Sequence, residues 1–360
     1  MKWSWKIATV SGIPVYLHAT FLVLIAFLLV ADLARGEGLR AALGGALFVV
    51  SIFATVVLHE FGHAFAARYY GIRTKDITLL PIGGIARLER LPDVPRQELW
   101  VALAGPAVNI VIAVVGWVAV VLFALGNPNL DLRSATDTPL GRFVAVNVWL
   151  AVFNMIPAFP MDGGRALRAL LAERLEYVRA TEIAANLGQG LALVFGFLGL
   201  FSNPFLIFIA LFVWMGASGE SAAVSVRSAI AGIPVSRAMI TDFRTLYEVE
   251  PLQRAAELVI AGSQQDFPVV DGEGRVVGIL TRDALVRALS EHGLSGFVGD
   301  VMTRTFQTAD ARDLLDQAFT RLQECACPVL PVLDGGRLVG LVTADNIGEY
   351  VMIRGALRRA

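Results

Sequence analysis

The stretch VVLHEFGHAFAARYY, residues 56–70, places two histidines and a glutamate in a segment that is otherwise largely apolar. Residues four apart share one face of a helix, so His59 and His63 can direct two imidazoles to one point, with Glu60 beside them. Neutral imidazoles at this spacing suit a zinc ion, and a neighbouring carboxylate can act as a base. The stretch therefore predicts a helix that carries a metal site.

The amino-acid composition indicates the medium around this helix. Hydrophobic residues make up 56% of the chain and charged residues 17%, and the mean hydropathy is +0.64, well above the values of soluble domains. The apolar residues are concentrated in the first two thirds of the chain, whereas the remainder has the composition of a soluble domain. The sequence therefore predicts an integral membrane protein with a soluble C-terminal part.

Six apolar segments are long enough to cross a bilayer, which takes roughly 20 residues of helix. They lie near residues 16–34, 43–70, 98–125, 140–161, 183–201 and 203–219. The residues SNP, 202–204, lie where the last two segments meet, which predicts a tight helical hairpin. The predicted fold class is a polytopic α-helical membrane protein of about six spans, with residues 1–220 as the membrane domain and an α/β module after it.

The distribution of Lys and Arg predicts the orientation of the spans. Within residues 1–220, most of these residues lie near the N-terminus and in the connections 71–97 and 162–182, and only Arg35, Arg40, Arg133 and Arg142 lie on the opposite side. The positive-inside rule places the basic side in the cytoplasm. We therefore expect a multi-pass protein with both termini and the soluble part in the cytoplasm. A bacterial or archaeal cell membrane is the expected location, a separate expectation that the charge distribution does not address.

Chance occurrence is the alternative to a metal site, because the His-Glu-x-x-His match is short. The chain has only four histidines, however, and two of them form the match. An ionisable side chain at membrane depth costs about 3 kcal/mol or more, so such residues are rarely kept without a role. Both points favour the metal site.

A hydrolytic zinc site needs a third protein ligand. The stretch NMIPAFPMDGGRALRALLA, residues 154–172, offers Asp162. Two prolines prevent a regular helix across residues 157–160, and the glycine pair after Asp162 allows a sharp turn. Irregular backbone at membrane depth is tolerated where it lines a cavity or is covered by protein. Asp162 is therefore the predicted third ligand, and its alternative role is the N-cap of a helix that begins at Arg165.

The soluble part contains an internal repeat after a small-residue linker, residues 221–233. FPVVDGEGRVVGILTRD (267–283) matches LPVLDGGRLVGLVTAD (330–345), and a lead segment, VSRAM or VGDVM, precedes each copy. Short Val/Ile/Leu runs alternate with glycine-containing turns and helical stretches, the pattern of small α/β units. We predict one unit at 234–290 and a second at 297–354, packed together as one module.

Cys325 and Cys327 are the only cysteines of the chain. A CxC pair without companions forms neither a disulfide framework nor a four-ligand zinc site. We expect reduced thiols in a cytosolic domain.

Three motifs together resemble the site-2 protease family, zinc metalloproteases that cleave within membranes. They are HEFGH in the second apolar segment, GPAVN (105–109) in the third, and NMIPAFPMDGG after the fourth. The C-terminal repeat resembles a pair of CBS domains, regulatory modules first named from cystathionine β-synthase. The two resemblances cover nearly the whole chain, and the subgroup of site-2 proteases with C-terminal CBS domains matches best. One departure is Phe159, where the wider family often has proline.

The resemblance implies that His59, His63 and Asp162 hold one zinc ion per chain and that Glu60 is the general base. Zinc would lower the pKa of a water molecule, and Glu60 would take its proton and return it to the leaving nitrogen. The implied function is regulated intramembrane proteolysis, the hydrolysis of a peptide bond in a membrane-tethered protein substrate.

Two asparagines near these motifs each have two open roles. Asn154 either donates to a substrate carbonyl or developing oxyanion, as a catalytic residue, or forms an interhelical hydrogen bond. Asn109 follows the helix-perturbing Gly105 and Pro106, and it either contacts the substrate or has a structural role.

The segment ITLLPIGGIARLE, residues 77–89, is apolar, too short to span the bilayer and interrupted by Pro81 and the pair Gly83 and Gly84. A substrate helix must be unwound before cleavage, because its backbone groups are bonded internally. We interpret the segment as a membrane-associated strand or hairpin whose free edge, around the glycine pair, receives the substrate by β-augmentation. A simple amphipathic loop is the alternative.

Each repeat places a threonine and an aspartate after a predicted buried strand, in GILTRD and GLVTAD. Such a carboxylate can accept hydrogen bonds from ribose hydroxyls, and the threonine can approach a phosphate or the sugar. The resemblance to CBS domains implies an adenine nucleotide such as ATP, ADP or AMP as regulator. The candidate residues are Thr281, Asp283, Thr343 and Asp345. Helix N-capping in a module that serves dimerisation is the alternative.

The remaining function classes are separated by charge and by Glu60. The net charge of −1, without a dense basic stripe, excludes nucleic acid as an expected partner. The expected partners are the lipid bilayer, the protein substrate, the nucleotide and a second copy joined through the CBS domains. The competing function is a nucleotide-sensing transporter or channel with an ion path of buried His and Asp. A permeation path has no need of a base beside two histidines, whereas hydrolysis does.

Overall fold

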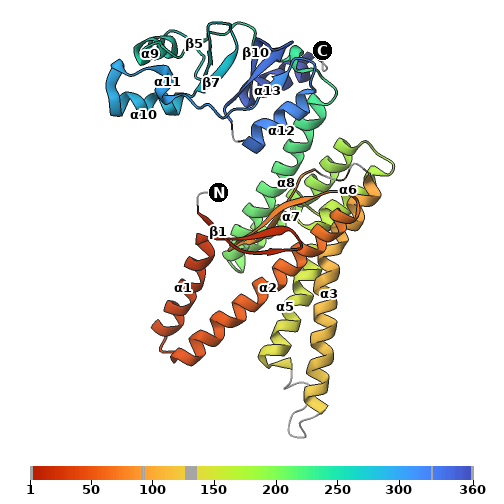
Figure 1. The fold of residues 1–360 in the computed structure, drawn as a ribbon. Coiled ribbons are helices and arrows are strands. Elements are labelled where there is room, and N and C mark those ends of the chain that lie inside the picture. The colour runs from red at the N-terminus through yellow and green to blue at the C-terminus, as the bar shows by residue number, and fades with distance from the viewer. Residues whose placement is uncertain (1–2, 91, 93, 126–135, 326, 358–360) are drawn as a thin grey trace. The chain divides into compact units, whose positions relative to one another are not determined.

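The computed structural model describes residues 3–90, 92, 94–125, 136–325 and 327–357. They form two compact units, Met1–Ala222 and Ala223–Ala360, called here the membrane unit and the C-terminal unit. The membrane unit is mainly helical, and the C-terminal unit alternates strands and helices (Figure 1).

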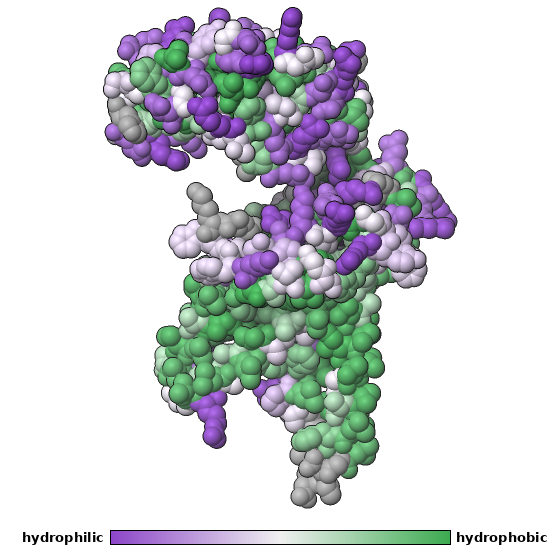
Figure 2. All heavy atoms as spheres, in the orientation of Figure 1, coloured by the Kyte–Doolittle hydropathy of each residue, from purple (hydrophilic) through white to green (hydrophobic). Residues whose placement is uncertain are grey.

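Long apolar helices form most of the membrane unit. Their bounds are α1 Ala19–Ala34, α2 Leu39–Tyr69, α3 Pro95–Leu125, α5 Pro139–Asn154, α7 Tyr177–Phe201 and α8 Phe205–Ile230. Among the described residues, α2, α3, α7 and α8 are long and apolar enough to cross a bilayer, and α1 and α5 are apolar helices of 16 residues each. Apolar side chains cover the outer surface around α1, α2 and α3 (Figure 2). Helices suit this medium because they satisfy every backbone group internally.

The helices depart most clearly from the predicted spans and linker in three places. α1 begins at Ala19, because the residues before it form a strand. α5 ends at Asn154, and irregular backbone replaces the end of the predicted span 140–161 before α6, Asp162–Ala172. The linker predicted at 221–233 is helical as far as Ile230. Its Ala and Ser residues do not break a helix as Gly-rich or Pro-rich linkers do.

A four-stranded sheet packs against α2. Its strands are β1 Ser4–Val10, β2 Ile13–His18, β3 Thr74–Leu80 and β4 Gly83–Leu88, in the order β1-β2-β3-β4. Val15 and Ile77 on one face pack with Phe61 and Ala64 of α2. β3 and β4 pair in antiparallel fashion, so the segment predicted at 77–89 belongs to a hairpin and is not a simple loop. β4 lies at one edge of the sheet, so one side of this strand has no neighbouring strand within the sheet.

The C-terminal unit contains two copies of one α/β arrangement. The first copy has β5 Leu246–Tyr247, α9 Leu252–Ala261, β6 Phe267–Val270, β7 Val276–Leu280 and α10 Arg282–His292, and the second has β8 Ala309–Asp310, α12 Leu315–Cys325, β9 Val329–Asp334, β10 Arg337–Thr343 and α13 Ala344–Leu357. In each three-stranded sheet the central strand has one parallel and one antiparallel neighbour. The predicted fold class, α-helical membrane domain followed by a tandem α/β module, is confirmed.

The two copies exchange their lead segments. Val235, at the start of the first copy, is buried in the core around Leu330 of the second. Val298, which begins the short helix α11 Val298–Val301, is buried in the core around Phe267 of the first. Neither copy therefore has a complete core of its own, and the two pack as one module.

Cys325 and Cys327 are joined by a disulfide bond, so the expectation of reduced thiols is wrong for this structure. Their Cα atoms are 5.0 Å apart, within the range that a disulfide spans. The end of α12 brings them together, because the amide of Cys327 donates to the carbonyl of Leu322 in that helix.

Candidate metal centre

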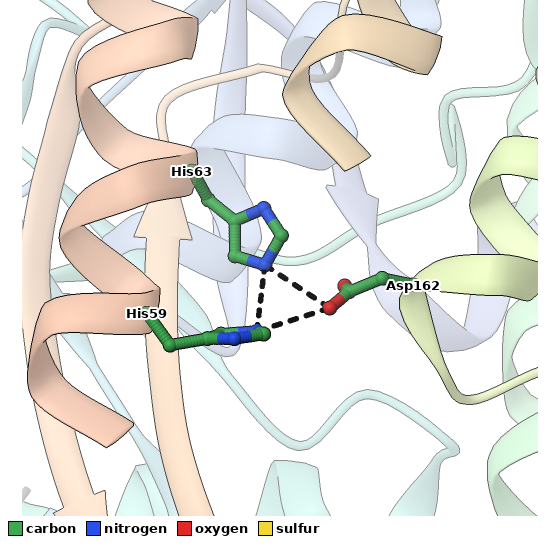
Figure 3. A group of neighbouring side chains, drawn as sticks. All are labelled: His59, His63 and Asp162. Atoms are coloured by element: carbon green, nitrogen blue, oxygen red, sulfur yellow. Dashed lines mark hydrogen bonds and ion pairs between the residues drawn. The ribbon is translucent and has the colours of Figure 1, made fainter. Parts of the chain in front are cut away.

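Two imidazoles and one carboxylate converge beside α2. His59 and His63 lie one turn apart on this helix, with ring planes at 80° to each other. Oδ2 of Asp162, the first residue of α6, lies 3.0 Å from Nε2 of His59 and 3.2 Å from Nε2 of His63, and the two Nε2 atoms are 3.1 Å apart (Figure 3). All three side chains are buried. The structure therefore brings together the three residues that the sequence predicts as ligands.

Helix α3 fixes both imidazoles from the other side. Nδ1 of His63 donates to the backbone carbonyl of Val101, and Nδ1 of His59 donates to Oδ1 of Asn109, each at 2.7 Å. Carbonyl oxygens only accept, so each neutral imidazole keeps its proton on Nδ1 and directs the lone pair of Nε2 toward Asp162. Two lone pairs and a carboxylate then face one another, and a cation between them would stabilise this arrangement.

The donor set fits zinc. The three donor atoms lie within 4.8 Å of one another, and the described part of the chain holds no second group of three His, Cys, Asp or Glu side chains arranged in this way. Two imidazoles and one carboxylate are the protein ligands of a common type of catalytic zinc site, which keeps a further position open.

Glycine residues give α3 room to approach the histidines. A Cβ atom on Gly105 would lie 2.2 Å from Nε2 of His63 and 2.6 Å from Nε2 of His59. A Cβ atom on Gly62 of α2 would lie 2.7 Å from the carbonyl oxygen of Ala104. Membrane helices approach closely where small residues line the contact. The first glycine of GPAVN therefore keeps the space at the tips of the imidazoles free of side chain.

The irregular segment between α5 and α6 delivers Asp162. Ala158 and Met161 are buried against Ala192 of α7 and Val213 of α8. The peptide bond between Phe159 and Pro160 is cis. This packing holds the segment on the inner faces of α7 and α8, as expected of irregular backbone that is covered by protein.

Asp162 is a ligand candidate and not the N-cap proposed as its alternative role. α6 begins at Asp162, and the N-cap is Met161. Gly163 and Gly164 leave no room for side chains, because a Cβ atom on either would come within 2.5 Å of backbone in residues 155–159. The glycine pair therefore lets α6 start directly against the segment that precedes it, which directs the carboxylate toward α2.

Glu60 stands between the histidines in sequence and touches the sheet edge. Its side chain is half-buried. A Cβ atom on Gly84 of β4 would lie 2.6 Å from Cγ of Glu60 and 3.2 Å from its Oε1. The edge strand thus passes directly beside the predicted base. Gly83, the first residue of β4, has a φ of +139°, a conformation that favours glycine.

The two asparagines differ in their surroundings. Asn109 is buried, and besides accepting from His59 its amide donates to Oδ1 of Asn147 at 3.4 Å. Both ends of this amide are engaged within the protein, which favours its structural role over substrate contact. Asn154 is the last residue of α5 and is half-buried, and within the described ranges its side chain has no hydrogen-bond partner.

Two polar residues at the site were not singled out from the sequence. Asn147 of α5 is buried, supports Asn109 and donates to the carbonyl of Phe143. A lone amide in an apolar span was the available signal, because such groups need partners in lipid. Arg168 of α6 is buried in an ion cluster, and an arginine on a short helix between glycines and leucines gives no comparable signal.

In the C-terminal unit, the two candidate threonines are helix caps. The Thr281 hydroxyl accepts from the amide of Ala284 at 3.2 Å, and the Thr343 hydroxyl accepts from the amide of Asn346 at 3.1 Å. These bonds satisfy amides that a helix start leaves without partners. The alternative role considered for these residues is therefore present in the structure.

The two candidate aspartates lie in the first turns of α10 and α13. Asp283 and Asp345 are both exposed. Close to the first, Asp266 accepts the amide of Arg282 at 3.0 Å, and burial raises the pKa of its carboxyl. Both candidate carboxylates are thus accessible to a ligand from water.

Comparisons with known proteins identify the family. Peptidase family M50 matches residues 47–129 and 130–195, and the CBS domain matches residues 235–291 and 298–352. A zinc metalloprotease of Methanocaldococcus jannaschii is 30% identical over 348 residues, which cover 96% of this chain and 96% of that protein.

Two further proteins are similar to part of this chain. Stage IV sporulation protein FB of Bacillus subtilis is 28% identical over 165 residues, which cover 45% of this chain and 54% of that protein. The structure of a site-2 protease from Methanocaldococcus jannaschii is 37% identical, with a TM-score of 0.46, and the match covers 61% of this chain and 95% of that chain. The chain belongs to peptidase family M50, the site-2 proteases, and is a zinc metalloprotease with two CBS domains.

Proposed function

We propose that this metalloprotease hydrolyses a peptide bond in a membrane-tethered protein, near the cytoplasmic side of the bilayer, with one zinc ion held by His59, His63 and Asp162. The observation that carries the proposal is the buried convergence of these three side chains on one point. α2, which carries the two histidines, has the length and composition of a membrane span. The substrate bond would therefore have to enter the unit at the level of the membrane helices.

The residues around the metal have separate tasks in this reaction. Zinc bound there would polarise the substrate carbonyl and lower the pKa of water. Glu60, one position from a ligand, takes the proton of the attacking water and returns it to the leaving nitrogen. The amide of Asn154, which has no hydrogen-bond partner among the described residues, donates to the developing oxyanion.

The free edge of β4 would hold the substrate extended. β4 lies at the edge of the sheet, and Gly84 on it touches Glu60. A substrate strand added to this edge would form backbone hydrogen bonds next to the base, without contacts that depend on substrate side chains. Gly83 and Gly84 are then substrate-binding residues, because the absence of side chains there leaves room for the substrate backbone beside Glu60.

The CBS pair would regulate cleavage from the cytoplasmic side of the membrane. Arg73, Lys75, Arg87 and Arg90 lie in the connection that contains β3 and β4, which the positive-inside rule assigns to the cytoplasm, together with both termini. An adenine nucleotide bound near Asp283 or Asp345 would regulate cleavage, and the CBS pair would join two copies as a homodimer. The protein would reside in a bacterial or archaeal cell membrane.

Zinc content and cleavage, measured together, test the protease assignment. Wild type, Glu60→Gln and His59→Ala are purified in detergent, zinc is measured by elemental analysis, and each is incubated in vesicles with a panel of single-span reporter proteins labelled at the cytoplasmic end. We expect about one zinc per chain in wild type and Glu60→Gln, cleavage by wild type alone, and loss of zinc in His59→Ala. Equal zinc content in His59→Ala would refute the assigned metal site.

Equilibrium dialysis of the detergent-solubilised protein with ATP, ADP and AMP tests the regulatory part. Asp283→Ala and Asp345→Ala are expected to weaken nucleotide binding, and Asp300→Ala, on the short helix α11, serves as the control. Binding unaffected by both substitutions would remove these residues from the nucleotide site. The competing transporter or channel function is not favoured, because the chain belongs to a peptidase family.

A further inference from the structure

Arg168 lies at the centre of a buried ion cluster outside the metal site. Its side chain is 0% exposed. Nε donates to Oε1 of Glu98 on α3 at 2.8 Å, and Nη1 donates to Oε1 of Glu220 on α8 at 2.7 Å. The rings of Phe159 and Tyr177 lie on the guanidinium, each with its centroid 4.9 Å from Cζ. One side chain thus connects α6 to α3, α7 and α8.

A buried ion cluster of this kind is weak evidence for stability and better evidence for a fixed geometry. Charges lose hydration on burial, and apolar side chains of similar size often stabilise a fold as well or better. The planar guanidinium, however, donates in directions that are set by its geometry, so it can hold two carboxylates at fixed positions. Arg168 therefore defines where α6 lies relative to α3 and α8.

The three predicted ligands are supported in different ways. Each histidine is held by a hydrogen bond from Nδ1 to α3. The carboxylate of Asp162, in contrast, faces only the two Nε2 atoms, and within the described ranges no hydrogen-bond donor outside the site holds it. Its position must therefore come from the helix that carries it. Metal ligands usually depend on such supporting groups for affinity.

We propose that Arg168 is the positioning residue that sets the place of Asp162 in the metal site. Arg168 lies six positions after Asp162 on α6, a rise of roughly 9 Å along a rigid short helix. Glu98 attaches this helix to α3, which also holds both imidazoles, so the cluster sets the carboxylate and the imidazoles against one common element. Glu220 makes α8 the second point of attachment. The inference rests on the proposed zinc site.

The test compares Arg168→Lys and Glu220→Gln with the wild-type protein. Lysine keeps the charge but cannot hold two carboxylates as the guanidinium does. The glutamine change is nearly isosteric, and the Glu220 side chain is 25% exposed, so this variant is expected to fold even if the first does not. We expect zinc affinity, measured by competition with a chromogenic chelator, to fall about 10- to 100-fold for Arg168→Lys and less for Glu220→Gln.

A spectroscopic readout separates ligand geometry from general loss of structure. Cobalt in place of zinc reports the ligand geometry through its visible absorption, and we expect its bands to shift in both variants. Ser218→Ala is the matched control. It removes the hydrogen bond from Gln189 to Ser218, which joins α7 to α8 two residues before Glu220 without involving α6. The control should keep the wild-type zinc affinity and cobalt spectrum.

Unchanged zinc affinity and an unchanged cobalt spectrum in Glu220→Gln, and in Arg168→Lys where that variant folds, would overturn the positioning role. An equal loss of affinity in Ser218→Ala would overturn it too, because any disturbance of the helix packing would then suffice. Failure of the zinc site itself is recognised separately, since His59→Ala would then bind zinc as tightly as wild type.

Discussion

The membrane unit and the C-terminal unit use their polar side chains in opposite ways. In the membrane unit His59, His63, Asp162 and Arg168 are buried and lie against one another or against neighbouring polar groups. In the C-terminal unit the candidate aspartates face water and the candidate threonines cap helices. Apolar surroundings make an unpaired polar group costly, so a buried cluster of polar side chains there indicates mutual pairing or a ligand. Burial therefore identifies the site in the first unit and not in the second.

Replacement of Gly105 by alanine, which adds a single methyl group, should have the largest effect on zinc content and cleavage. The added carbon would lie 2.2 Å from Nε2 of His63, so at least one imidazole must move away from the metal. We expect zinc content near zero by elemental analysis and no detectable cleavage. Gly190→Ala in α7 is the control, since no heavy atom lies within 4 Å of its new carbon. Full zinc occupancy in Gly105→Ala would contradict this expectation, because it would mean that α3 moves away and the imidazoles keep their positions.

Gly84→Ala should impair the base Glu60 and leave zinc binding unchanged. The new carbon would lie 2.6 Å from Cγ of Glu60, which must shift by about 1 Å, and a misplacement of this size can cost about 100-fold in rate. Zinc content should remain at the wild-type level, because no ligand is touched. Steady-state cleavage of a reporter substrate would show the loss in kcat. Loss of zinc together with activity would contradict this separation of base and metal.

The sequence predicted the metal ligands and the base, but it did not predict the residues that hold them in position. His59, Glu60 and His63 are recognisable because their spacing on a helix is fixed, and Asp162 because a proline-rich break in an apolar segment requires a reason. The partners Val101, Asn147 and Arg168 follow from packing between helices, and no local pattern in a single sequence contains that information.

The fold shows the same limit. Apolar length predicted the six helices, because lipid leaves backbone groups no partner outside the segment itself. The exchange of lead segments between the two copies was not predictable, because Val235 would satisfy the apolar pattern of either core. The predicted linker is helical as far as Ile230, because Ala favours a helix and a small residue by itself does not end one.

Asn109→Leu should weaken the metal site without abolishing it. The substitution removes the acceptor of His59 Nδ1 and the donor to Oδ1 of Asn147. We expect zinc affinity to fall about 10- to 100-fold, with cleavage restored by excess zinc. Asn147→Leu, one bond further from the metal, should have a smaller effect in the same chelator titration. Cleavage that stays low at saturating zinc would instead support the substrate contact considered for Asn109.

Thr281→Ala and Thr343→Ala should have the smallest effects and leave the membrane unit unchanged. Each removes one cap from a helix start, which lowers stability by about 1 kcal/mol, whereas Thr→Ser should retain the cap. Denaturation of the C-terminal unit in the full-length protein, followed with and without AMP, measures both roles of these residues. Reduced stability with an unchanged nucleotide effect would assign the threonines to capping alone, and the exposed aspartates would then have to supply the recognition. A nucleotide effect lost in alanine and kept in serine would instead show that the hydroxyl serves the ligand, although burial gives no sign of it.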